Sequence, residues 1–423
     1  MHEDPWRLTV TEAARRIAAG TLHPETLVES CLDRIAAREP EVRAFAWFDP
    51  AGVRGAAGRA ASGPLRGIPI GVKDVLDTAD MPSAYGSPIW RGWQPRADAA
   101  PVAWARAAGA VVMGKTVTTE FATRTPGPTT NPVNPAHTPG GSSSGSAAGV
   151  AAGFFPVAYG TQTAGSVIRP AAYCGVVGYK PSYALIDRAG MKIMSASLDT
   201  VGLLARSIAD CALVAGTVSG RDLGDPERRP DRAPRIGVCR SPTWDAADAP
   251  TQALLQRVAD RLAQAGASVS ERALPPLFGH LIEAHPVVMN AESARALGWE
   301  LATAREEISA SLQERLAFGL AQSGATLDAA YETFRETQAA FPSATEGLDV
   351  LLTPAAPGEA PAGIGWTGDP ALNFIWTSLH VPCVTVPAGT GPNGLPLGIQ
   401  IVGRRGEDRA VLAWAQWVAA AIG

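Results

Sequence analysis

Residues 67–74 read GIPIGVKD, and this stretch begins the pattern that decides the fold. Ile68 to Val72 is a short apolar run of the kind that forms a buried strand. A helical pattern follows near residues 98–108, and a second apolar run, AVVM, follows at 110–113. Short apolar runs that alternate with helical segments are typical of an α/β protein with a mainly buried sheet.

The same alternation resumes on both sides of a long helical region near residues 290–341. We therefore expect one domain with an insertion rather than two independent domains. Its expected parts are peripheral N-terminal helices forming a hairpin (1–60), a core (61–220), a charged connector with a helical insertion (221–345), and C-terminal strands that complete the sheet (346–423).

Composition excludes several classes of protein. Hydrophobic residues make up 46% and charged residues 18% of the 423-residue chain, which excludes a disordered protein. A net charge of −4 without a dense basic patch argues against a nucleic-acid partner. No apolar run reaches the about 18 residues of a membrane span, and the first residues, MHEDP, lack the basic start of a signal peptide. Because the five cysteines are scattered and the histidines show no ligand spacing, we expect a cytoplasmic protein without disulfides or a metal.

Two motifs match known signatures but fail on context. Residues 109–116, GAVVMGKT, fit the phosphate-loop pattern, yet an apolar strand replaces the flexible loop, so Lys115 is expected to be structural. Residues 141–145, GSSSG, fit the nucleophile-elbow pattern, but the prolines before them exclude the central strand that an elbow requires. The candidate bases for such an elbow would be His280, His285 and His380.

Three segments remain whose residues together could carry out nucleophilic catalysis without histidine: GVKD at 71–74, GGSSSGS at 140–146 and GTQTAGSVIRP at 160–170. Lys73 lies opposite the apolar face of its strand, where small neighbours leave it room to face a cleft and burial would lower its pKa. Asp74 points the other way and need not keep Lys73 protonated. The composition of the Gly/Ser segment alone favours a flexible turn. In the third segment, consecutive N–H groups after a strand can converge as an oxyanion hole requires.

At these residues the sequence resembles the amidase signature family, whose hallmark is a Gly-Gly-Ser-Ser loop followed by a turn of the type seen at 162–169. Further matching stretches are GKT at 114–116, YCGVVGYKP at 173–181, SLDTVG at 197–202, PCVTVP at 382–387 and GLPLGIQIV at 394–402. The resemblance implies an α/β/α domain around a central mixed, twisted sheet. It also implies amide hydrolysis through an acyl-enzyme, without a cofactor. The implied residues are Ser166 as nucleophile, Ser142 as a bridging serine on a cis peptide, Lys73 as the ultimate base, and Thr163, Ala164 and Gly165 as the oxyanion hole.

Within the family, the segment around Ser166 is most similar to that of malonamidases. This similarity implies a small half-amide substrate such as malonamate, a homodimer, and Arg169 and Gln162 at the substrate. The alternative for Arg169 is a structural ion pair with Asp187 or Asp199. Ala164 stands where the family has glycine, which would cost about 1 kcal/mol if the position needs a positive φ.

Two other functions stay open. One is the glutamine-hydrolysing subunit of a tRNA-dependent amidotransferase, which would need a partner chain and ATP. The chain looks shorter than those subunits, and residues 166–169 resemble the stand-alone enzymes more. The other is a non-catalytic binding protein on the same scaffold. We expect the pocket walls to come from the segment around Trp90, the helical insertion and the loop at 355–376.

Overall fold

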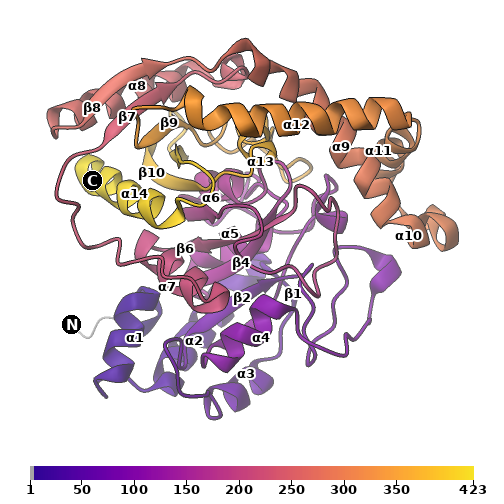
Figure 1. Cartoon of the computed structure of the whole chain (residues 1–423). Helices are drawn as coiled ribbons and strands as arrows, with labels where there is room; N and C mark the ends of the chain where they lie inside the picture. The colour runs from indigo at the N-terminus through magenta and orange to yellow at the C-terminus, as the bar shows by residue number, and fades with distance from the viewer. Residues whose placement is uncertain (1–3) are drawn as a thin grey trace.

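The computed structural model describes residues 4–423 and is built around one mixed sheet (Figure 1). Residues 1–3 lie outside the described residues. They belong to the stretch MHEDP, on which the expectation of no signal peptide rests. Within those residues the sheet has eleven strands in the order β1-β3-β2-β4-β6-β5-β10-β11-β9-β7-β8. The strands are β1 Phe45–Trp47, β2 Pro69–Lys73, β3 Val111–Thr116, β4 Val157–Gln162, β5 Val177–Lys180, β6 Thr200–Ala205, β7 Arg235–Cys239, β8 Ser268–Arg272, β9 Val350–Pro354, β10 Cys383–Thr390 and β11 Pro396–Val402.

The strands run in both directions, which confirms the expected mixed sheet of an α/β protein. Strand β2 is parallel to β3 and β4, and β7 is parallel to β8 and β9, whereas β4, β6, β5, β10 and β11 pair antiparallel in turn. Every residue of β2, β3, β4, β6 and β9 is buried, so both faces of the central strands are covered. This burial explains the continuous apolar runs in the sequence.

Two connected groups of helices cover the sheet. Helix α7 (Ile208–Ser219) contacts α1 (Val10–Ala18), α4 (Ala100–Ala107) and α14 (Asp408–Ile422), and α14 also contacts α8 (Ala249–Gln264). Helix α5 (Ser144–Ala152) contacts α6 (Ile168–Cys174) and α2 (Pro24–Val42), which in turn contacts α3 (Pro50–Ala57). Helices α1 and α2 are the two N-terminal helices that the sequence predicts. No helix in residues 4–423 is long and apolar enough to cross a membrane.

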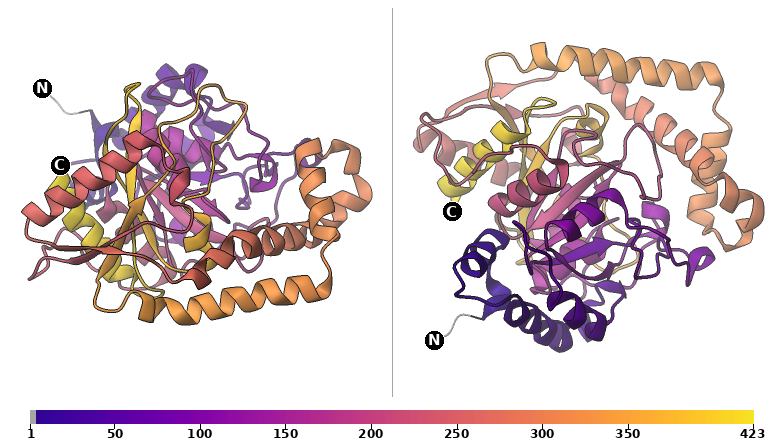
Figure 2. Two further views of the ribbon diagram at one scale, coloured as in Figure 1. Left: turned by 90° about the horizontal axis from the view of Figure 1, so that it is seen from above. Right: turned by 60° about the horizontal axis from the view of Figure 1, so that its bottom comes forward.

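The predicted helical insertion lies between β8 and β9 and starts earlier than the sequence indicates. It comprises α9 (Leu281–Ala296), α10 (Gly298–Thr303), α11 (Ala310–Leu320) and α12 (Gly324–Ala344). Figures 1 and 2 show these helices along one side of the molecule, with α10 and α11 at the outer end. Helix α9 packs against α13 (Phe374–Ser378), which joins the insertion to the C-terminal part of the sheet.

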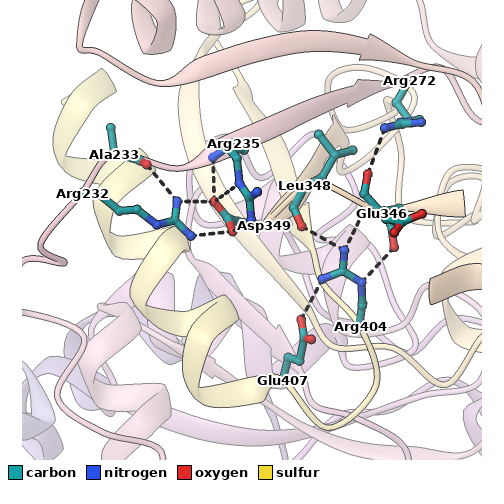
Figure 3. A network of polar contacts seen from close by, with 10 residues as sticks. Arg232, Ala233, Arg235, Arg272, Glu346, Leu348, Asp349, Arg404 and Glu407 are labelled. Atoms are coloured by element: carbon teal, nitrogen blue, oxygen red, sulfur yellow. Dashed lines mark hydrogen bonds and ion pairs between the residues drawn. The ribbon is translucent and has the colours of Figure 1, made fainter. Parts of the chain in front are cut away.

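The connector at 221–235 is fastened to the sheet by a network of charged side chains (Figure 3). Arg232 and Arg235 both pair with Asp349, at 2.6 and 3.0 Å. Nearby, Arg404 donates to the carbonyl of Leu348 at 2.9 Å. These contacts hold the start of β7 beside the start of β9.

Candidate active site

Lys73 is the last residue of β2, and its amine reaches the Gly/Ser loop. The side chain is fully buried, with Nζ 2.7 Å from Ser142 Oγ and 2.7 Å from Thr161 Oγ1. Burial lowers the pKa of Lys73 to about 7, although Asp199 favours the charged form. A substantial share of Lys73 is therefore neutral near pH 7, in contact with a hydroxyl group from which it can accept a proton.

The Gly/Ser loop is buried and tightly held, which excludes the flexible turn that its composition favours. The Gly141–Ser142 peptide is cis, as the resemblance implies. Ser143 Oγ donates to the Thr161 carbonyl at 3.3 Å, and Ser146 Oγ donates to the Tyr159 carbonyl at 2.7 Å. These serines fasten the loop and the start of α5 to strand β4.

The loop also requires a glycine where it passes another part of the backbone. A Cβ at Gly145 would lie 2.1 Å from the carbonyl oxygen of Ala44, a distance that no real side chain tolerates. Gly145, three residues after Ser142, therefore allows the loop to pass close to the backbone at Ala44.

Ser166 lies in the turn between β4 and α6, at the floor of a cavity of about 360 Å³. Among the described residues, the N–H groups of Thr163, Ala164, Gly165 and Ser166 donate to no other protein group. Ala164 is not among the residues with positive φ, so alanine carries no backbone penalty there. The turn thus offers free N–H donors next to a hydroxyl group that faces a cavity.

Gln162, expected at the substrate, is fully buried and holds this turn together. Its Oε1 accepts from the N–H groups of Val167 and Ile168 at 2.9 and 3.0 Å, and its Nε2 donates to Thr377 Oγ1 at 3.1 Å. With these contacts, the side chain fixes the start of α6 directly after the turn that holds Ser166.

Arg169 lies on α6 and lines the cavity without a charged partner. Its Nη2 donates to the Gly141 carbonyl at 2.7 Å and to Thr367 Oγ1 at 3.3 Å, while Nε and Nη1 have no partner within residues 4–423. Its expected alternative, an ion pair with Asp187 or Asp199, does not form among the described residues. Asp199 instead accepts from Thr163 Oγ1 at 2.5 Å. Burial lowers the pKa of Arg169 to about 10, so the side chain stays charged at neutral pH.

The cavity wall comes from the helical insertion and from the loop before α13, as expected. Ile282, His285, Pro286 and Met289 contribute from α9, and residues 366–370 contribute from the loop. The expectation for Trp90 is wrong: its ring packs at 5.6 Å from Trp93 and 5.1 Å from Trp299, and its Nε1 donates to Glu300. Aromatic burial against the insertion keeps Trp90 out of the cavity lining.

Positive charge dominates the cavity. Arg124 and Arg315 line it together with Arg169, and neither has a hydrogen-bond or ion-pair partner in the described part of the chain. Burial, together with the neighbouring charge of Arg124, lowers the pKa of Arg315 to about 10. Asp369 is the acidic residue of the lining. The site is thus suited to an anionic ligand.

The sequence reasoning missed the roles of four residues around the turn: Thr161, His285, Thr377 and Asp199, which accepts a hydrogen bond from Thr163. Thr377 Oγ1 donates to the Ala164 carbonyl at 2.8 Å, and His285 Nε2 lies 3.0 Å from the Thr163 carbonyl. Asp199 lies in the matching stretch SLDTVG, and Thr161 lies within the quoted turn, so both had a local signal. His285 and Thr377 had none, because folding alone brings them to the site.

The motif that resembles a phosphate loop takes a structural role. Residues 111–116 form the buried strand β3, and Lys115 pairs with Asp74 rather than with a phosphate. No group of three or more metal-ligating side chains is found in the described residues.

The comparisons with known proteins agree with this geometry. The family model described as Amidase matches residues 26–412. Among curated relatives, a glutamyl-tRNA(Gln) amidotransferase subunit of Roseiflexus castenholzii is 32% identical over 96% of this chain and 94% of its own. The subunit of the same name from Anaeromyxobacter dehalogenans is 34% identical over 97% of this chain and 95% of its own.

Solved structures include a protein described as an amidase, with 30% identity, a TM-score of 0.90, and coverage of 98% of this chain and 100% of that one. The peptide amidase of Stenotrophomonas maltophilia has 31% identity and a TM-score of 0.82, over 98% of this chain and 97% of that one. A 6-aminohexanoate cyclic dimer hydrolase has 25% identity and a TM-score of 0.91, over 99% and 98% of the two chains. The chain belongs to the amidase family and is a hydrolase that acts on amide C–N bonds.

Proposed function

We propose that Ser166 is the nucleophile of this amidase and that Lys73, acting through Ser142, is its base. The observation that carries the proposal is the 2.7 Å contact between the buried Lys73 Nζ and Ser142 Oγ, together with the lowered pKa of Lys73. A neutral buried amine that touches a hydroxyl group can accept its proton, and that hydroxyl can take the proton of a second serine.

The reaction has two stages. As Ser166 Oγ bonds to the amide carbon, its proton passes to Ser142 and the Ser142 proton passes to Lys73. The N–H groups of Thr163, Ala164 and Gly165 hold the oxyanion. The C–N bond then breaks, Lys73 returns the proton through Ser142 to the leaving nitrogen, and ammonia or an amine departs. Water attacks the acyl-enzyme by the same proton path and releases the carboxylic acid and free Ser166.

The substrate we propose is a small carboxamide that carries a carboxylate, such as a half-amide of a dicarboxylic acid. Three arginines, Arg124, Arg169 and Arg315, line the cavity beside a single aspartate. Guanidinium groups without a carboxylate partner in the described residues are well suited to bind the carboxylate of a ligand. This charge pattern supports a half-amide, as in the resemblance to malonamidases, more than a neutral aliphatic amide as the substrate.

An ammonia-release assay tests both parts of the proposal. We expect half-amides to be hydrolysed with higher kcat/KM than neutral amides of the same length, and we expect Ser166→Ala, Lys73→Ala and Lys73→Arg to lose turnover. The loss expected for the lysine variants is about 10²- to 10⁴-fold, the contribution of a positioned base. Wild-type ammonia release by Ser166→Ala would refute the nucleophile, and equal rates on half-amides and neutral amides would refute the substrate class.

A second candidate is glutamine hydrolysis within a multi-subunit amidotransferase. The relatives named as glutamyl-tRNA(Gln) amidotransferase subunits support it, and glutamine carries both a carboxylate for the arginines and an ammonium group for Asp369. The purified chain separates the two candidates. Rapid amide hydrolysis by the chain alone favours the stand-alone enzyme, whereas glutamine hydrolysis that appears only with partner chains favours the amidotransferase.

Two further expectations belong with this proposal. The five cysteines are free and buried, which supports a reducing, cytoplasmic location. The proposal of a homodimer rests on the family resemblance alone, and light scattering of the purified protein tests it.

A further inference from the structure

His285 contacts the proposed oxyanion hole from the helical insertion. The residue lies on α9, its side chain is 3% exposed, and its Nε2 is 3.0 Å from the carbonyl oxygen of Thr163. Since a carbonyl oxygen only accepts, Nε2 must carry the proton. The ring also packs on Phe374, with a centroid distance of 5.1 Å, so its orientation is fixed.

The contact orients a catalytic donor because a peptide unit is planar. The Thr163 carbonyl and the Ala164 N–H belong to the same trans peptide, so they point in opposite directions. A hydrogen bond to this carbonyl therefore sets the direction of the Ala164 N–H. Thr377 does the same for the next unit, because its Oγ1 donates to the Ala164 carbonyl at 2.8 Å and so orients the Gly165 N–H.

Other contacts on this turn do not hold that carbonyl. Thr163 is held through its side chain by Asp199, and Gln162 binds the N–H groups of Val167 and Ile168. Among the described residues, His285 is the group that binds the Thr163 carbonyl. Without it, the 163–164 peptide could rotate and turn its N–H away from the reacting carbonyl.

We propose that His285 is a positioning residue for the oxyanion hole, which aims the Ala164 N–H by holding the Thr163 carbonyl. This inference rests on the proposed function of Ser166 and its turn. It gives a role to a histidine that the sequence presents only as one of three candidate bases for a false nucleophile elbow. It also links α9, which lines the cavity through Ile282, Pro286 and Met289, to the reacting centre.

The test compares His285→Leu and His285→Gln with a matched pair, His380→Leu and His380→Gln. His380 is a half-buried histidine with a similar contact: its Nε2 lies 2.7 Å from the Ser197 carbonyl, and its ring stacks on Tyr183 at 4.1 Å. His380 is not part of the cavity lining, so its variants report the cost of losing such a contact elsewhere. The measurements are kcat, KM and the unfolding midpoint, with the best amide from the ammonia-release panel.

We expect His285→Leu to lower kcat at least about tenfold with KM changed less than about twofold; outright loss of an oxyanion donor costs about 10²- to 10³-fold. His285→Gln places an amide N–H near the position of Nε2 and should restore most of kcat. The His380 variants should keep kcat while losing similar stability. Equal kcat for His285→Leu and His380→Leu, an effect on KM alone, or no rescue by glutamine would overturn the inference.

Two additions keep the outcome decisive. If His285→Leu does not fold, His285→Asn replaces it, because its shorter amide cannot reach the carbonyl; equal kcat for the Asn and Gln variants would then overturn the inference. Ser166→Ala is measured in the same assay. Activity of Ser166→Ala refutes the proposed nucleophile, whereas an inactive Ser166→Ala beside a fully active His285→Leu refutes only the role of His285.

Discussion

The Nζ atom of Lys115 lies 3.1 Å from Oδ1 of Asp74, the residue that directly follows Lys73 in the chain, and the ion pair is buried. The carboxylate of Asp74 therefore pairs with Lys115 and not with its sequence neighbour Lys73. Lys73 forms no ion pair within residues 4–423, and its nearest partners are the hydroxyl groups of Ser142 and Thr161. Burial consequently dominates the pKa of Lys73.

The first prediction concerns pH. Lys73 acts as a base only when neutral, and its pKa is lowered to about 7 by burial. Protonation therefore removes activity as the pH falls, so kcat/KM should be level above about pH 7.5 and fall about tenfold per pH unit below about pH 6.5. Steady-state kinetics between pH 5 and 9 measure this profile, with circular dichroism as the control for folding. A folded enzyme with constant kcat/KM down to pH 5 would contradict it.

Removing the partner of Lys115 should destabilise the fold. Asp74→Asn leaves a buried ammonium group without its counter-charge, and such losses cost about 3–5 kcal/mol of unfolding free energy. Urea unfolding measures the difference. The control is Glu332→Gln, which breaks an exposed pair with Arg335 and should cost less than about 1 kcal/mol. The double variant Asp74→Asn with Lys115→Met should regain part of the loss, and a single variant as stable as the control would refute the buried-pair argument.

Thr161 should matter for catalysis because it orients the amine of Lys73. Its Oγ1 accepts a hydrogen bond from Nζ at 2.7 Å, which leaves the nitrogen lone pair free to face Ser142. Thr161→Val removes this acceptor, and we expect kcat to fall about 10- to 100-fold, the equivalent of one hydrogen bond to a charged or reactive group. Thr161→Ser keeps the hydroxyl group and should retain most activity. Similar kcat values for the two variants would show that the contact does not orient the base.

The sequence predicted the parts of this site that are local. Lys73, Ser142 and Ser166 lie in three short motifs, and the apolar runs at 68–72 and 110–113 locate β2 and β3. His285, Thr377 and Arg315 come from segments more than 100 residues away from Ser166, and no local pattern fixes where such residues meet. Four strands were also not predicted. Strand β1 has three residues and β8 is largely exposed at a sheet edge, while β5 and β6 overlap stretches that were noted only for the family resemblance. The segment around Trp90 was wrongly predicted to line the cavity, because its ring packs against Trp93 and Trp299, and the sequence pattern does not reveal such a cluster.

The last prediction concerns the network that fastens the connector. Asp349 pairs with Arg232 at 2.6 Å and Arg235 at 3.0 Å, and it accepts the Arg235 N–H at 2.8 Å (Figure 3). Burial alone would raise the pKa of Asp349, but the hydrogen bonds from Arg232 and Arg235 outweigh it and hold the pKa well below its ordinary value of 3.8. Because both arginines are half exposed, we expect Asp349→Asn to cost only about 1 kcal/mol at pH 7.

The pH dependence of that cost identifies its cause. A carboxylate with a lowered pKa in the folded state stabilises the protein above its ordinary pKa, and this stabilisation is lost as the pH falls through 3.8 toward the folded-state value. The difference between wild type and Asp349→Asn in urea unfolding should therefore shrink between about pH 5 and pH 3, whereas Glu332→Gln should show little change. A difference that stays constant over this range would assign the effect to packing at the start of β9 rather than to charge.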